Sequence, residues 1–98
     1  MEKTFSIKTT RGTLNIKGEL SLINTSEIWG KLNNLSDSIN KINLSEIKAL
    51  DVSILQQLIL IKLKHEKLKI TAEIPGNIHS VIENCQMTHI FSSLTVKN

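Results

Sequence analysis

Residues 42–64 constrain the fold more than any other part of the chain, because they combine strand and helix patterns in one stretch. Ile42 and Leu44 alternate with polar neighbours, which predicts a short, central strand followed by a turn. Asp51 is the predicted N-cap of a helix that reaches about Lys64, since apolar residues beyond Asp51 recur at helical spacing. A strand, a turn and an apolar helix in this order indicate an α/β fold in which the helix covers a sheet.

Two short strands are expected before this unit. Apolar and polar residues alternate around residues 5–7 and again around residues 14–16. Arg11-Gly12 lies between the two segments and is typical of a hairpin turn that uses a glycine. The chain is therefore expected to open with a β-hairpin.

Two further helices and a fourth strand are expected from similar signals. Asn24 is followed three residues later by Glu27, as in a capping box, and predicts a helix that ends near residues 33–37. Residues 68–74 alternate as a strand does, up to a Pro-Gly pair. Residues 77–85 place apolar side chains at i, i+3, i+4 and i+7, which predicts a third helix.

The predicted order of elements is ββαβαβα, within a single domain that comprises residues 1–98. Strands that alternate with helices after an opening hairpin predict a mixed sheet, with its later strands parallel and its helices packed on the sheet. Residues 91–96 fit either an edge strand or a short helix, and the sequence pattern does not distinguish the two.

Composition excludes several classes of protein. Ile and Leu supply 28 residues against three aromatic ones, so the core is expected to consist of branched aliphatic side chains. The single cysteine cannot form an internal disulfide, and no apolar run approaches the ~20 residues that span a bilayer. The first residues lack the apolar region of a secretion signal. We therefore expect a cytoplasmic protein without direct membrane insertion.

The charge pattern makes nucleic acid a poor candidate partner. Twelve basic and nine acidic residues give a net charge of +3, and the lysines are scattered along the sequence. Phe5, Trp29 and Phe91 lie too far apart in the sequence to form a platform for stacked bases.

No group of residues has the spacing of a catalytic, metal or cofactor site. Ser53 and His65 lie on one predicted helix, roughly 18 Å apart at 1.5 Å per residue, and cannot form a dyad. His79, Cys85 and His89 lack a fourth zinc ligand nearby. The four glycines form no phosphate-binding loop. We expect no enzyme activity, no metal and no cofactor, although an unrelated small α/β enzyme stays open as an alternative.

The helix after Asp51 has a polar side with an apolar centre. Leu60 is predicted to lie opposite the sheet-facing residues, with Val52 and Leu63 at the border of this side. Its polar neighbours are Ser53, Gln56, Gln57 and Lys64. This pattern fits either a single exposed leucine, which is common, or a small docking surface.

The chain resembles the STAS domain family, which includes anti-sigma-factor antagonists and the accessory subunits of bacterial lipid-transport ABC systems. The resemblance rests on Asn43-Leu44-Ser45 at the end of a strand and on Asp51-Val52-Ser53-Ile54-Leu55 at the start of a helix. It extends from the opening hairpin through Phe91. Val52 stands where switchable antagonists have a phosphorylated serine or threonine, and Ile54 stands where the family has a glycine.

The resemblance implies a STAS-like fold and a protein partner that is bound through this helix and the loop before it. The implied partner-binding residues are Asp51, Val52, Ser53, Gln56, Gln57 and Leu60. Trp29 resembles a tryptophan of the ABC-associated subunits. We therefore predict a non-catalytic module that docks on the ATPase subunit of a phospholipid-transport ABC system, at the inner face of the membrane through that partner.

The alternative function is an anti-sigma-factor antagonist that binds an anti-sigma serine kinase. In this interpretation Val52 replaces the usual phosphoacceptor, because valine has no hydroxyl group. Ser53 is then the only nearby candidate for phosphorylation.

Overall fold

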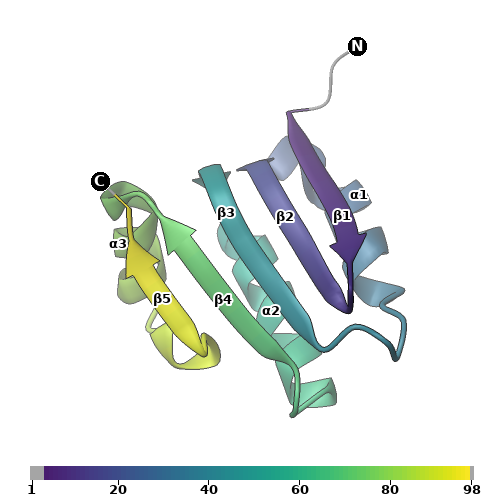
Figure 1. Ribbon diagram of the computed structural model, residues 1–98. Coiled ribbons are helices and arrows are strands. Elements are labelled where there is room, and N and C mark those ends of the chain that lie inside the picture. The colour runs from purple at the N-terminus through teal and green to yellow at the C-terminus, as the bar shows by residue number, and fades with distance from the viewer. Residues whose placement is uncertain (1–3, 98) are drawn as a thin grey trace.

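The computed structural model describes residues 4–97, in which five strands pair into one sheet in the order β1-β2-β3-β4-β5 (Figure 1). The elements are β1 (Phe5–Thr10), β2 (Thr13–Leu20), the 3-10 turn η1 (Leu22–Asn24), α1 (Thr25–Asn33), β3 (Lys41–Leu50), α2 (Val52–Lys64), β4 (Lys69–Ile74), α3 (Gly76–Asn84), the 3-10 turn η2 (Thr88–Ile90) and β5 (Ser93–Val96). β1 and β2 are antiparallel, and the other three pairs are parallel. The predicted mixed α/β sheet and the predicted opening hairpin are confirmed.

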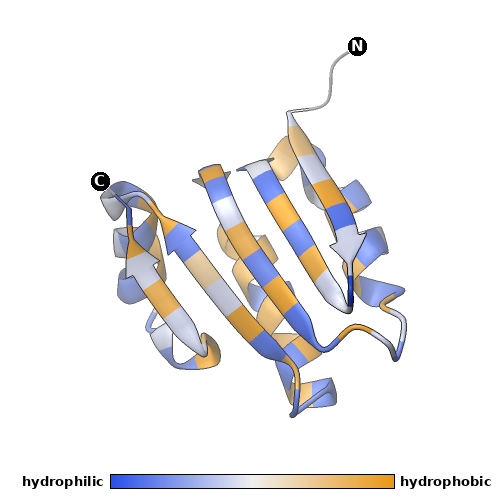
Figure 2. Ribbon diagram, in the orientation of Figure 1, coloured by the Kyte–Doolittle hydropathy of each residue, from blue (hydrophilic) through white to orange (hydrophobic). Residues whose placement is uncertain are grey.

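All three α-helices lie on one face of the sheet, behind the strands in Figure 1. Each new parallel strand is added on the same side of the previous one, so right-handed crossovers carry every helix to the same face. The strands alternate between apolar and polar residues, visible as orange and blue bands in Figure 2. The apolar side chains point toward the helices, and the polar ones lie on the uncovered face.

The core between the sheet and the helices consists of aliphatic side chains, as the composition predicts. The largest fully buried side chains are Ile16, Leu20, Ile28, Leu32, Ile42, Leu44, Ile47, Ile54, Leu55, Leu58, Ile70 and Ile74. They come from β2, β3, β4, α1 and α2, and α3 adds the fully buried Ile82, so the central strands and all three α-helices contribute to the core.

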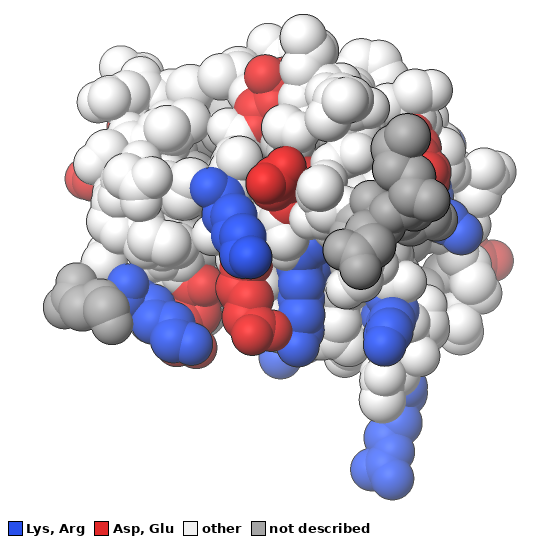
Figure 3. Space-filling view, turned by 90° about the horizontal axis from the view of Figure 1, so that it is seen from above, with Lys and Arg blue, Asp and Glu red and all other residues white. Residues whose placement is uncertain are grey.

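Polar pairs cross the uncovered face of the sheet. Asn43 on β3 donates to the side-chain oxygen of Asn15 on β2, at 3.4 Å, and accepts a hydrogen bond from Thr71 on β4, at 2.8 Å. Lys17 and Glu46 form an ion pair at 2.8 Å. In the view from the carboxyl ends of the parallel strands, several of the visible Lys and Arg side chains project from this side of the molecule, at the bottom of Figure 3. This polar face is suited to solvent, and no helix formed by residues 4–97 covers it.

β3 is longer than the short strand predicted, because residues 45–50 continue it instead of forming a turn. Ile16 pairs with Leu44, Gly18 with Ile47 and Glu19 with Ala49, so β3 carries one extra residue relative to β2 at each of two register shifts. Glu46 takes up the first bulge with a φ of 50°. The bulge interrupts the period of two, which is why the sequence pattern resembled a turn. The strand continues because Ile47 and Leu50 beyond the bulge are buried in the core.

The predicted capping box at Asn24 is wrong. Asn24 precedes α1, but its side chain makes no capping hydrogen bond, because η1 already places its backbone in a helical conformation. The side-chain amide instead donates to Thr4 Oγ1 and to the Glu19 carbonyl oxygen, each at 2.8 Å. Asn24 therefore connects the start of α1 to β2 and to Thr4, the residue before β1.

The C-terminal segment, which the sequence left undecided, forms β5 at the edge of the sheet. It pairs in parallel with β4, so Leu94 lies beside Ala72. α3 agrees with the predicted third helix, and Asn98 lies outside the described residues. None of the helices within residues 4–97 has the length and apolar character required to cross a bilayer.

Candidate docking surface

Asp51 caps α2, as the sequence predicts. Its backbone is extended, with φ −80° and ψ 145°, and its Oδ2 accepts a hydrogen bond from the Ser53 N–H at 2.9 Å. The Ser53 hydroxyl donates to the same oxygen. The Asp51 N–H donates to the carbonyl oxygen of Leu20, at 2.7 Å. The first turn of α2 is therefore fixed both internally and to the end of β2.

The same bonds control the ionisation of Asp51. The hydrogen bond from the Ser53 hydroxyl and then the one from its backbone N–H favour the carboxylate and hold the pKa of Asp51 below its usual range. A group whose pKa is lowered by folding stabilises the protein above its unfolded pKa of about 4. This stabilisation is lost as the pH falls through the lower pKa of the folded state.

Replacing Asp51 with alanine is expected to lower the free energy of unfolding by about 1 kcal/mol at neutral pH, because α2 loses its cap. The difference from the wild type should shrink as the pH falls below about 4. Urea unfolding at several pH values measures it. Asp37→Ala is the matched control, since Asp37 is exposed and makes no hydrogen bond with another of residues 4–97. An equal loss in both variants would contradict the capping role.

The outward side of α2 exposes three large aliphatic side chains. Val52, Leu60 and Leu63 are 40%, 61% and 71% exposed, and Gln56 between them is also exposed. The predicted exposure of Leu60 is confirmed. Leu63 is more exposed than Leu60, although the sequence placed it only at the border of this side. We call Val52, Gln56, Leu60 and Leu63 the outer face of α2.

Gln57 does not belong to this surface, which corrects the prediction that it contacts a partner. It is only 8% exposed, and its Nε2 donates to Asn33 Oδ1 on α1. Helix geometry correctly places Gln57 off the sheet side, but the sequence does not reveal that α1 packs against this side of α2. The pair therefore fixes α2 against α1.

Further exposed apolar residues lie near the start of α1. Trp29 is 38% exposed and is therefore not a core residue. Leu22 and Ile23 in η1 are both largely exposed, and neither was among the residues predicted from the sequence to form a binding surface. Two consecutive aliphatic residues between Ser21 and Asn24, outside any periodic segment, were the available signal.

The histidine, cysteine and serine residues considered as catalytic or zinc-binding groups do not form such a site in the structure. His79 Nδ1 lies 2.8 Å from Glu83 Oε1 one turn along α3, and Cys85 is a free, half-buried thiol. Among residues 4–97, no three His, Cys, Asp or Glu side chains are arranged to hold a metal ion. Ser53 and His65 lie at opposite ends of α2.

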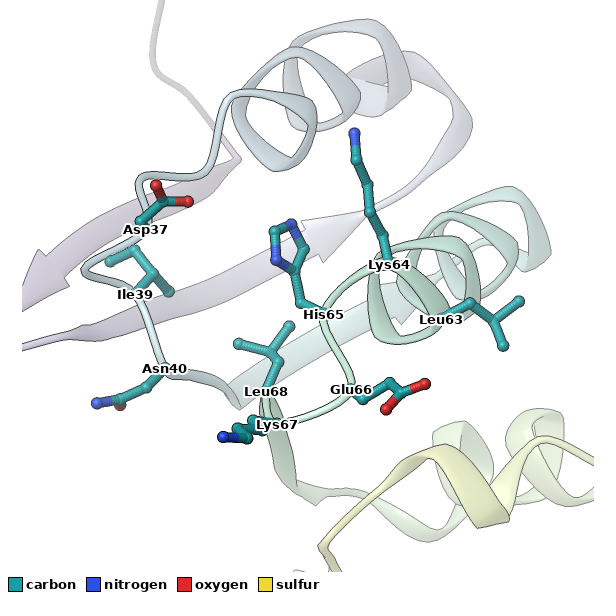
Figure 4. A pocket seen from close by; sticks show the side chains of 9 residues that line it. All are labelled: Asp37, Ile39, Asn40, Leu63, Lys64, His65, Glu66, Lys67 and Leu68. Carbon is teal, nitrogen blue, oxygen red and sulfur yellow. The ribbon is translucent and has the colours of Figure 1, made fainter.

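A hollow of about 500 Å³ lies beside the C-terminal end of α2 (Figure 4). Asp37, Ile39 and Asn40 line one side, and the α2–β4 turn with His65 and Lys67 lines the other. The hollow lies at the opposite end of α2 from Asp51.

Comparison with other proteins does not assign the chain to a family. A scan against models of protein families finds no match to this chain, and a search of curated proteins finds none either.

Proposed function

We propose that the protein is a non-catalytic, STAS-like binding module that docks through the outer face of α2 on a nucleotide-binding protein. The proposed partner is the ATPase subunit of a bacterial phospholipid-transport ABC system. The observation that carries the proposal is the exposure of Val52, Leu60 and Leu63 along one side of a capped helix.

The composition of the outer face supports docking. The opposite side of α2 is buried, so these aliphatic side chains contribute little to the protein's own core. Interface centres are apolar and poor in charge, and Gln56 is the uncharged polar residue within this face. Ser53 and Lys64 lie at its two ends and supply a polar rim.

The rigidity of α2 also supports docking. Asp51 fixes the first turn, and the bond between Gln57 and Asn33 holds the helix against α1. A surface that is ordered before binding loses less conformational entropy when it binds. The resemblance of this segment to the STAS family is the reason for proposing an ATPase as the partner.

A co-expression experiment tests the proposal. We expect the tagged protein to purify with the ATPase subunit of its own organism's lipid-transport system. Leu60→Asp and Leu63→Asp should each weaken the complex at least about thirtyfold, since each places a charge in an apolar interface centre. Val96→Asp is the matched control, because Val96 is an exposed aliphatic residue on β5, away from α2. Circular dichroism confirms that the variants are folded.

Two results would contradict the proposal. Binding of both α2 variants at wild-type strength would mean that docking uses another surface. A stoichiometric phosphate on Ser53, after incubation with an anti-sigma serine kinase and ATP, would favour an anti-sigma-factor antagonist instead. The Ser53 hydroxyl donates to Asp51, which does not favour its use as a phosphoacceptor.

A further inference from the structure

The amino ends of the parallel strands gather basic side chains that are scattered along the sequence. The Gly12 carbonyl oxygen accepts hydrogen bonds from the Asn40 and Lys41 N–H groups, at 2.9 and 3.3 Å, and the Asn40 carbonyl oxygen accepts one from Lys69 N–H at 3.1 Å. These bonds join the hairpin turn to the starts of β3 and β4. The α2–β4 turn lies next to Asn40 across the hollow of Figure 4. We call Arg11, Lys41, Lys64, Lys67 and Lys69 the basic edge.

The basic edge has an excess of positive charge. Its five cations are accompanied by two acidic residues, Asp37 and Glu66, which leaves a net charge of +3. The whole chain also carries +3, so the remainder is balanced. None of the five cationic side chains forms an ion pair or a hydrogen bond with another of the described residues 4–97.

Two of these cations are held side by side. Lys41 and Lys69 are register partners on β3 and β4, and both side chains lie on the uncovered face of the sheet. Like charges on directly neighbouring strand positions repel each other. The fold places this pair without an acidic residue opposite it, so a negatively charged surface would relieve the repulsion.

The surroundings of the basic edge favour a bilayer over other anionic partners. The cations come from several separate segments and surround no enclosed pocket, so they fit an extended surface better than a single small anion. Clusters of exposed basic side chains are attracted to the surface of anionic lipid, and each contributes about 1 kcal/mol near that surface.

Nucleic acid is a weaker fit. The lining of the hollow contains no aromatic side chain, and the aromatic residues Phe5, Trp29 and Phe91 are not part of the basic edge. Single-stranded nucleic acids are usually held by aromatic stacking in addition to charge.

We propose that the basic edge docks the protein on the surface of a bilayer that contains anionic phospholipid. This inference goes beyond partner binding by α2 and does not depend on it. In this orientation α2, with 13 residues and a length of about 20 Å, directs Asp51 away from the lipid. The first part of the outer face stays accessible to a protein partner.

Sedimentation with lipid vesicles tests the proposal. We expect the protein to bind vesicles of phosphatidylcholine with one-third phosphatidylglycerol and not vesicles of phosphatidylcholine alone, at physiological salt. The double variant Lys41→Gln/Lys69→Gln should bind the anionic vesicles roughly thirtyfold more weakly, because each lysine near such a surface contributes about a fivefold factor. Lys69 is exposed and Lys41 is half-buried, and circular dichroism verifies that the double variant is folded.

The matched control is Lys48→Gln/Lys97→Gln, which removes the same charge near the carboxyl ends of β3 and β5. This control should lose less than threefold. Equal losses in the two double variants, or equal wild-type binding to both kinds of vesicle, would overturn the proposal. Failure to bind vesicles together with binding to an oligonucleotide would reassign the basic edge to nucleic acid.

Discussion

Replacing Gly18 with alanine is expected to lower the free energy of unfolding by at least about 3 kcal/mol. Gly18 lies on β2 with a φ of 98°, a conformation that side chains rarely adopt. A Cβ atom there would lie 2.3 Å from the Thr4 carbonyl oxygen and 2.8 Å from Phe5 Cα. Both contacts are with backbone, which cannot rotate away. β1 would therefore have to separate from β2 at this end.

The opposing backbone is itself fixed. The Thr4 carbonyl oxygen accepts a hydrogen bond from the Glu19 N–H at 2.8 Å, and Phe5 is the register partner of Gly18. Moving β1 away to admit a methyl group would break this pairing. Chemical denaturation monitored by circular dichroism measures the loss of stability.

Gly30→Ala is the control for this substitution. Gly30 lies in α1, and a Cβ atom there would have no neighbour within 4 Å. Alanine at this position should stabilise the protein by about 0.5–1 kcal/mol, because it restricts the unfolded chain and favours the helix. If Gly18→Ala unfolds within about 1 kcal/mol of the wild type, the close approach of β1 to Gly18 is not as the structure has it.

Leu58→Ala should lower the free energy of unfolding by about 3–5 kcal/mol, because Leu58 is fully buried and its loss leaves a cavity between α2 and the sheet. Leu60→Ala, two residues further along the same helix, should change stability by no more than about 0.5 kcal/mol, since most of its side chain is in solvent. Urea unfolding of the two variants gives both values.

The Leu58→Ala and Leu60→Ala variants also distinguish an effect on stability from an effect on partner binding. If the outer face of α2 binds a partner, Leu60→Ala should weaken the complex while leaving the fold intact. Leu58→Ala, measured at a temperature where it stays folded, should bind nearly as well as the wild type. A Leu60→Ala variant that loses as much stability as Leu58→Ala would mean that Leu60 is buried and has no outward role.

Periodicity was sufficient to predict most of the fold. The alternation at residues 5–7 and 14–16 and the helical spacing after Asp51 each correspond to an element of the structure. The parallel pairing of the later strands followed from the alternation of strands and helices after the hairpin. The bulge at Glu46 was not predictable, because an extra residue shifts the alternation and makes a continuous strand resemble a turn.

The candidate docking surface was predictable only where position along the helix determines the exposure of a side chain. Asp51 as cap and Leu60 as an outward residue follow from position along α2. The burial of Gln57 depends on α1, whose position against α2 is a tertiary property. The pairing of Lys41 with Lys69 likewise appears only once the register of β3 and β4 is known.

The order of strands in the sheet has a consequence for how the chain folds. Every strand pairs with the one that precedes it in the sequence, so no strand has to be inserted between two that are already joined. Contacts between neighbouring segments require less loop closure than contacts between distant ones, and chains rich in them fold faster. Assembly can therefore start at the hairpin and proceed outward, one helix and one strand at a time, during synthesis of the chain.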